Sequence, residues 1–164
     1  MNNKSLETLI REELARARTA SDVDNMVLPL AKRLAEAVEA EAARIGVNAV
    51  VAISDCAARP VLIHVMEDAY IASYDVALQK AYTVVALKMS TMDLKPLAQP
   101  GGSLYGIQFT NDGKIVIFGG GEPLRVGDRV IGGLGVSGGS EEQDAALAAY
   151  GARVFAQLVN NASN

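Results

Sequence analysis

Residues 118–140 read FGGGEPLRVGDRVIGGLGVSGGS and contain nine of the chain's 15 glycines. Glycine lacks a Cβ, so it serves where a backbone must turn sharply or come close to another group. The glycines form two clusters, 119–121 and 132–139, and a strand-like segment, Arg129–Val136, overlaps the second. Two interpretations follow. The clusters are turns and close contacts of a compact sheet, or they line a site where a ligand meets the main chain.

A nucleotide site is the less favoured interpretation of this stretch. The first cluster follows a strand-like segment, as a phosphate-binding loop would, but such a loop needs a helix directly after it. Pro123 intervenes there, and the Lys-Ser/Thr pair of a Walker loop is missing. The second cluster leads through Ser137 and Gly138 towards a helix. Its amides could receive a carboxylate or phosphate, or it is a strand-to-helix turn with a capping serine.

The spacing of apolar residues around the glycine stretch predicts three long helices and two hairpins. Helices are expected over 21–45, 71–89 and 141–159, with Pro29 as a kink or later start of the first and Ser140 as N-cap of the last. Strands are expected over 47–54, 61–66, 106–110, 114–118 and 129–136, and residues 92–102 are expected to be a loop. Tight turns between strands favour an antiparallel arrangement. The predicted fold is therefore α/β in the α+β sense: a five-stranded antiparallel sheet flanked by helices.

The composition limits the classes of partner and the cellular compartment that are expected for this protein. The 164 residues suit one main domain with an appendage, and the net charge of −4 with no basic stripe argues against a nucleic-acid partner. The single cysteine excludes an internal disulfide and fits a reducing cytoplasm. No apolar run approaches the roughly 20 residues needed to span a bilayer, so no membrane partner is expected.

Two residues could carry chemistry outside the glycine stretch. Lys80 lies beside an apolar helix face, where it could pair with a ligand carboxylate or with an acid such as Asp55, and Tyr82 follows it; a solvated lysine or an internal salt bridge is the alternative. His64, the chain's one histidine, lies in a predicted strand. It could bind a haem iron or a metal axially, or it is a partly buried, hydrogen-bonded side chain.

Several blocks occur in an order that resembles a known family. They are Met66–Ala69, Ser73–Ala77, Lys80–Thr83, Tyr105–Ile107, Ile115–Gly121 with Pro123, and Val130–Gly139 with Asp144. This pattern resembles the family of GlcG, HbpS and the C-terminal domain of PduO-type corrinoid adenosyltransferases, and is closest to the PduO-type branch. The likeness covers about residues 27–151.

The resemblance implies a profilin- or roadblock-like fold, a homo-oligomer, and haem or a corrinoid as the possible cofactor. The adenosyltransferase activity belongs to a different domain, which this chain lacks. The haem-binding PduO-type domain is expected to use a histidine on its N-terminal helix, and this chain has none there. If haem binds, then His64, a methionine or a hydroxyl group must serve instead.

The N-terminal segment carries a second resemblance. Residues 1–14, MNNKSLETLIREEL, are similar to the encapsulation peptides that direct enzymes into bacterial microcompartments. Leu6, Leu9, Ile10 and Leu14 form an apolar stripe at helical spacing, which could dock on a shell protein through residues 1–17. The alternative is an ordinary helix packed on the domain or on a second subunit. The expected organisation is a segment, 1–20, and a domain, 21–164.

The sequence therefore predicts a non-catalytic accessory protein that binds a tetrapyrrole or related small molecule, in the cytoplasm or in the lumen of a microcompartment for diol or aldehyde metabolism. One alternative is a small enzyme that uses Lys80 and Asp55 near the glycine loops. Another is a structural module for oligomerisation. The candidate ligand-binding residues are Lys80, Asp55, Tyr82, Gly119, Gly120, Gly121, Ser137 and Gly138, with His64 as a candidate haem ligand.

Overall fold

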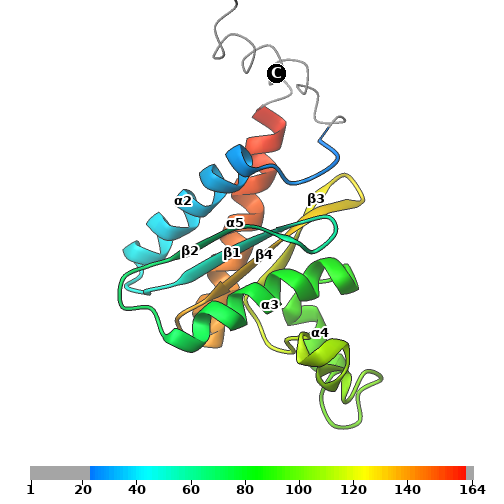
Figure 1. The fold of residues 1–164 in the computed structure, drawn as a ribbon. Helices are drawn as coiled ribbons and strands as arrows, with labels where there is room; N and C mark the ends of the chain where they lie inside the picture. Colours follow the sequence, from blue (N-terminus) through cyan, green and yellow to red (C-terminus); the bar gives the residue numbers. More distant parts are fainter. Residues whose placement is uncertain (1–22, 162–164) are drawn as a thin grey trace, which may run out of the picture.

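The computed structural model describes residues 23–161, which form an α+β fold built on one antiparallel sheet (Figure 1). The strands are β1 (Val50–Asp55), β2 (Pro60–Val65), β3 (Gly121–Val126) and β4 (Arg129–Ser137). Their order in the sheet is β2-β1-β4-β3. The α-helices of this part are α2 (Leu28–Arg44), α3 (Ile71–Leu87), α4 (Thr91–Leu97) and α5 (Glu141–Asn161).

The sheet has four strands within residues 23–161, so the expectation of five was wrong. The predicted hairpin over 106–118 is not formed. Two short 3-10 turns, Ile107–Phe109 and Asn111–Gly113, take its place. The segment after them runs beside α3, where Thr83 Oγ1 accepts from the amide of Val116 at 3.0 Å. The single proton of this hydroxyl is shared between the carbonyls of Gln79 at 2.8 Å and Lys114 at 3.2 Å. A side chain of α3 thus satisfies backbone groups that the sequence assigned to a strand partner.

The sequence missed β3 because its residues, GEPLRV, contain two turn-forming types. Among residues 23–161, β3 is an edge strand that pairs with β4 alone, and proline is tolerated at such an edge because one side of the strand makes no ladder bonds there. The first glycine cluster therefore leads into a strand instead of ending one. Helix α4 also replaces part of the expected loop, and its N-cap residue Ser90 accepts a hydrogen bond from the amide of Asp93 at 3.0 Å.

The long helices match their sequence signals. Helix α2 begins at Leu28 with Pro29 in its first turn, which confirms a later start, and it stops just before Gly46, whose φ is +72°. Ser140 caps α5 as predicted: its Oγ accepts from the amide of Gln143 at 3.2 Å, and its own amide donates to Gln143 Oε1 at 2.9 Å.

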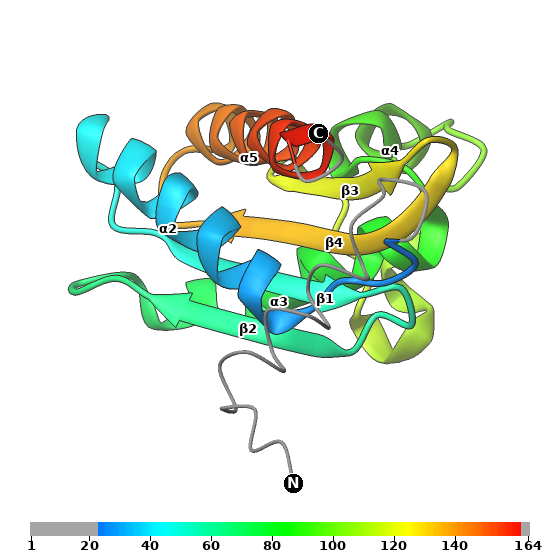
Figure 2. The same ribbon diagram turned by 90° about the horizontal axis from the view of Figure 1, so that it is seen from above.

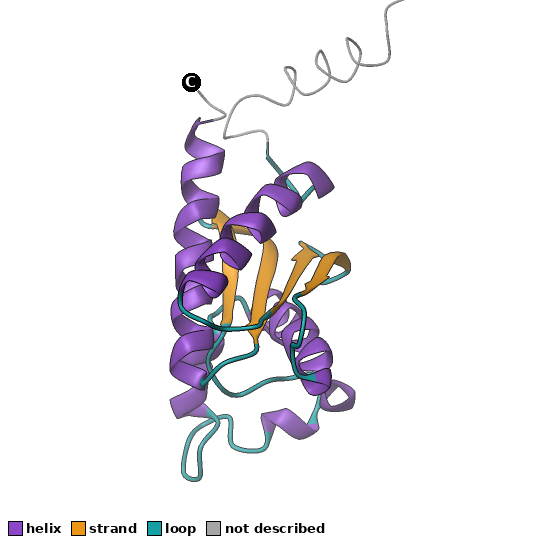
Figure 3. Cartoon of the chain, turned by 90° about the vertical axis from the view of Figure 1, so that its left-hand side faces the viewer, coloured by secondary structure: helices purple, strands orange, loops and turns teal. Residues whose placement is uncertain are grey.

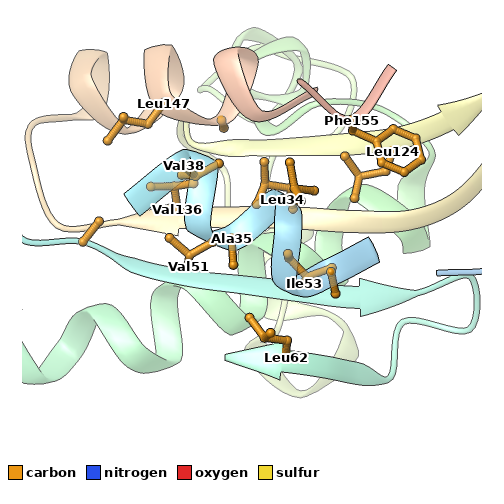
Figure 4. Packing of buried hydrophobic residues seen from close by; sticks show 14 of the residues in the cluster. Leu34, Ala35, Val38, Val51, Ile53, Leu62, Leu124, Val136, Leu147 and Phe155 are labelled. Carbon is orange, nitrogen blue, oxygen red and sulfur yellow. The ribbon is translucent and has the colours of Figure 1, made fainter. Parts of the chain in front are cut away.

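The sheet lies between two helical layers (Figures 2 and 3). Helices α2 and α5 cover one face, and α3 covers the other. The main core fills the space under α2 and α5, where alternate residues of the central strands meet the buried faces of both helices (Figure 4). Its members include Leu34, Val38, Val51, Ile53, Leu62, Leu124, Leu134, Val136, Leu147 and Phe155.

The opposite face is built from small residues. Ala52 of β1 is the register partner of Gly135 of β4, and both face α3. A Cβ at Gly135 would lie 2.0 Å from the carbonyl oxygen of Ala77, and one at Gly133 would lie 2.3 Å from that of Ala81. The glycines of β4 therefore let the α3 backbone rest directly on the sheet. This close contact explains the centre of the glycine stretch without a ligand.

In the described part of the chain, no helix combines the length and apolar character needed to cross a membrane.

Candidate functional site

Lys80 is fully buried inside the molecule, between α3 and the end of β4. Its ammonium donates to the carbonyl oxygen of Val136 at 2.8 Å and to Asp144 Oδ2 at 2.9 Å. The Phe118 ring lies against the same ammonium, with its centroid 5.0 Å from Nζ. Burial lowers the pKa of Lys80 below its usual value, while the nearby carboxylates act in the opposite direction.

Asp144 completes this cluster, which we call the Lys80–Asp144 junction. Its second oxygen, Oδ1, accepts from the amides of Gly138 at 3.1 Å and Gly139 at 2.9 Å. Asp144 lies in the first turn of α5, where a carboxylate is also favoured by the helix dipole. The junction thus ties α3, the end of β4 and the start of α5 together, with both carboxylate oxygens satisfied.

The predicted pairing of Lys80 with Asp55 is not formed. Asp55 lies at the β1–β2 turn, where its carboxylate accepts from the amides of Ala57 at 2.8 Å and Arg59 at 2.9 Å and from Arg59 Nε at 2.9 Å. Burial raises the pKa of this carboxyl, but these hydrogen bonds outweigh it and hold the pKa below its usual value. Asp55 therefore closes a hairpin turn, and Lys80 and Asp55 do not share a site.

The first glycine cluster is packed against the same region. A Cβ at Gly120 would lie 2.5 Å from Lys80 Nζ, so glycine leaves room for the ammonium. The amide of Gly119 donates to Glu141 Oε1 at 2.9 Å, and that of Gly121 donates to Thr91 Oγ1 at 2.9 Å. These amides are occupied by the protein's own side chains and do not form an open anion cradle.

The remaining predicted residues divide between the junction and other places. Ser137 borders the junction and is buried, with its Oγ 3.1 Å from that of Ser73. Tyr82 instead contacts the 3-10 turn at residues 111–113 and the residue that follows it. Its hydroxyl accepts from Asn111 Nδ2 at 3.3 Å, and Lys114 Nζ lies 5.7 Å from its ring centroid. Of the predicted ligand residues, the structure gathers Lys80 and the glycines into one structural junction and leaves Asp55 and Tyr82 apart.

His64 lies on the edge strand β2, close to helix α2. Its Nδ1 is 2.5 Å from Glu39 Oε1, and its side chain is 39% exposed. The pair lies in an open hollow of about 280 Å³, which we call the His64 hollow; its lining residues are Glu39, Ile63, His64, Val65 and Met66. Within residues 23–161, no cluster of three or more histidine, cysteine or acidic side chains could hold a metal ion.

Glu39 was not among the residues predicted from the sequence, and Asp144 was named only as part of a family block. Glu39 lies four residues after Ala35 and three before Ala42, both buried, so it flanks the apolar face of α2. This spacing indicates that the side chain of Glu39 is half-buried, but it does not identify the residue that Glu39 contacts. The targeting residues, Leu6, Leu9, Ile10 and Leu14, lie outside the described residues.

Comparison with known protein families gives one match over most of the chain. A family model described as "Haem degrading protein HbpS-like" matches residues 27–153. An uncharacterised 15.0 kDa protein from the dhaT–dhaS intergenic region of Citrobacter freundii is 42% identical over 139 residues, which cover 85% of this chain and 98% of that protein.

Two further similarities concern PduO. The corrinoid adenosyltransferase PduO of Salmonella typhimurium is 41% identical over 116 residues, which cover 71% of this chain but 34% of that enzyme. The chain therefore spans about a third of the length of that relative. A crystal structure of a PduOC–haem complex has 37% identity and a TM-score of 0.76, covering 79% of this chain and 94% of the other.

Proposed function

This chain belongs to the HbpS-like family, and on that premise we propose that it is a non-catalytic accessory protein that binds haem or a related tetrapyrrole. The observation that carries the proposal is the similarity to the haem complex of PduOC, at 37% identity over 79% of the chain. The similarity covers 79% of this chain and 94% of the PduOC chain, so it supports the proposal at the level of the whole domain.

Within residues 23–161, the imidazole of His64 is a side chain that could hold a haem iron. Imidazole nitrogen is a common axial ligand, and an axial histidine is often held by a carboxylate or carbonyl at its other ring nitrogen. His64 has such a carboxylate partner in Glu39 and is partly exposed. Haem bound there would supply an iron able to take axial ligands.

The relatives support a metabolic setting for this binding. One is named for its position between dhaT and dhaS, and another is a corrinoid adenosyltransferase. The adenosyltransferase is about three times the length of the matched region, so its activity is not transferred to this chain. We place the protein in diol or aldehyde metabolism, in or beside a bacterial microcompartment, as a homo-oligomer.

The geometry gives less support to the two alternatives. The enzyme that would use Lys80 and Asp55 lacks a shared site, because Asp55 closes a turn and Lys80 is sealed in the junction. A purely structural oligomerisation module would need no exposed histidine held by a carboxylate. A measurement of tetrapyrrole binding distinguishes such a module from the proposed function.

Titration with haemin is the decisive test of the proposed function. We expect the purified protein to shift and sharpen the Soret band with saturation near one haem per chain, and cobalamin serves as a parallel ligand. A bound spectrum that persists under reductant and oxygen supports an accessory binder. Loss of the Soret band under those conditions would indicate haem degradation. No spectral change with either ligand would contradict tetrapyrrole binding.

The targeting proposal concerns residues 1–17. We expect a fluorescent reporter fused to this segment to gather in foci in cells that produce microcompartment shells, because an apolar helical stripe can dock on a shell protein. The matched control replaces Leu6, Leu9, Ile10 and Leu14 with serine, which removes the stripe and keeps the length. Diffuse fluorescence of the unmodified fusion would refute the targeting role.

A further inference from the structure

We propose that the N-terminal segment of this chain, residues 1–17, docks on a hollow of its own domain, between the β3–β4 hairpin and the end of α5. The hollow is lined by residues 125–127 and 129 of the hairpin and by Ala156, Val159 and Asn160 of α5, and we call it the Arg125 hollow. The inference goes beyond the proposed targeting role, because it gives the segment a second binding site within the protein itself. It does not depend on tetrapyrrole binding.

The Arg125 hollow offers an apolar surface of suitable size. Its volume is about 500 Å³, and the part of its lining that solvent reaches is mainly apolar. Val126 lines it half-buried, and Ala156 lines it exposed. Val27 and Leu28, at the start of α2 on the same side of the molecule as the end of α5, are 51% and 46% exposed (Figure 1). This end of the domain therefore exposes aliphatic side chains that a second apolar surface would bury.

The chain enters the domain at the rim of this hollow. Arg129, which lines the hollow, donates to Asp24 Oδ1, and the amide of Met26 donates to the carbonyl oxygen of Ile131 at 2.9 Å. Five residues, 18–22, link the segment to this anchor, and they span at most about 18 Å. A tether this short gives the segment an effective concentration on the order of millimolar at a site beside the anchor. An intrinsic affinity of about millimolar would therefore keep about half of the molecules docked.

The apolar stripe of the segment contains one acid. Glu13 follows Leu9 by four residues and Ile10 by three, so at helical spacing it lies in the middle of the face that carries the stripe. A carboxylate buried against a purely apolar surface would be costly, because it would lose its hydration without gaining a partner. The segment therefore fits an apolar surface that also presents a cation.

Arg125 supplies that cation at the hollow. Its guanidinium donates to the backbone carbonyl oxygens of Lys88 at 2.6 Å and Asp128 at 3.2 Å, and no carboxylate among residues 23–161 pairs with it. Glu13 placed beside Arg125 would provide the missing counter-charge, while Leu9, Ile10 and Leu14 cover the apolar lining. The pattern of the segment thus complements the hollow in both polarity and charge.

Self-docking and shell docking would use the same apolar stripe, so one molecule can make only one of these contacts at a time. A shell protein must then compete with the hollow for the segment. Its apparent affinity for the full chain is reduced in proportion to the fraction of molecules that are undocked. The Arg125 hollow would thus control how readily the protein enters a shell.

Disulfide trapping in the full chain tests the contact. Leu14→Cys is combined with Ala156→Cys in a chain that also carries Cys56→Ser, which removes the exposed native thiol. We expect mild oxidation to form an intramolecular disulfide at least about tenfold faster than in the matched pair of Ala15→Cys with Ala156→Cys. Ala15 has the same tether but lies on the opposite face at helical spacing. Equal rates would overturn the docking, and so would a disulfide between two chains, which would place the segment on a second copy.

Charge reversal tests the match between Glu13 and Arg125. With the Leu14 and Ala156 cysteine pair in place, we expect Glu13→Arg or Arg125→Glu alone to slow trapping about three- to fivefold, as the loss of an exposed ion pair would. The two reversals together should restore the rate to within about twofold, which a damaged hairpin would not do. The control is Glu12→Arg, an acid away from the apolar face, and it should leave the rate unchanged. Unchanged rates in both single variants, or no recovery in the double variant, would overturn the pairing.

Targeting and self-docking fail in different experiments. If the reporter fused to residues 1–17 stays diffuse while the Leu14 pair traps faster than the Ala15 pair, the targeting role falls and self-docking stands. If the reporter gathers in shells but the two cysteine pairs trap at equal rates, the targeting role stands and only self-docking is overturned.

Discussion

Asp144→Ala is expected to destabilise the protein by about 3–5 kcal/mol, because it leaves the Lys80 ammonium buried without its counter-charge. Lys80 is fully buried and cannot turn to solvent in place of its partner. The same substitution removes the acceptor of the Gly138 and Gly139 amides, which adds unsatisfied backbone donors. Urea unfolding followed by circular dichroism measures the loss.

Two companion variants test this explanation. The double substitution Lys80→Met with Asp144→Leu removes both charges, and we expect it to be less destabilising than Asp144→Ala alone. Lys95→Ala is the surface control: its pair with Glu141 at 2.6 Å is partly exposed, so the expected cost is about 0–1 kcal/mol. If Asp144→Ala costs no more than Lys95→Ala, the junction does not stabilise the fold in the way proposed.

Gly135→Val is expected to prevent stable folding, and Gly135→Ala to lower stability by at least about 3 kcal/mol. A Cβ at this position would lie 2.0 Å from the backbone carbonyl oxygen of Ala77, and a backbone atom of a packed helix cannot move aside as a side chain can. Helix α3 would have to lift off the sheet, which would separate Ala77 and Ala81 from their contacts with β1. The thermal midpoint and the near-ultraviolet spectrum report this change.

Gly119→Ala provides the matched control for the glycine argument. Its Cβ would meet the terminal methyl of Met92 at 2.7 Å, the end of a flexible side chain that can shift. We therefore expect a loss of about 1 kcal/mol or less. Equal losses for Gly119→Ala and Gly135→Ala would show that backbone contact with α3 does not explain the β4 glycines.

The elements that the sequence predicted correctly have strong local signals. Helix α2 has Pro29 in its first turn and Gly46 after its end, and α5 begins with a Ser140–Gln143 capping box. The predicted strands over 47–54, 61–66 and 129–136 became β1, β2 and β4 with shifts of a few residues. In each case the residues of the element contain the reason for its conformation.

The elements that it missed depend on distant partners. The segment 114–118 has the composition of a strand, but Thr83 of α3 takes up its backbone groups. Conversely, GEPLRV reads as a turn and becomes β3 because β4 offers it an edge to pair with. The residues of a short segment do not determine which distant segment will form hydrogen bonds with its amides.

The candidate site shows the same division. The sequence identified Lys80 and His64 as residues of interest from their type and their apolar neighbours. It did not supply their partners, Asp144 and Glu39, which lie 64 and 25 residues away along the chain. The family blocks predicted membership of the family that includes HbpS, and the match of the HbpS-like family model to residues 27–153 confirms it. A series of motifs in order can be recognised from the sequence alone.

What the sequence alone determined is the three long helices, the antiparallel hairpin of β1 and β2, the family, and the need for close backbone contact along residues 118–140. The tertiary structure decided what that contact is with: β4 glycines meet α3, and Gly120 makes room for Lys80. It also decided that Lys80 is a structural ion pair while His64 stays accessible. Local conformation depends on neighbours in the chain, whereas the role of a charged side chain depends on burial and counter-charge, which arise only when distant segments pack.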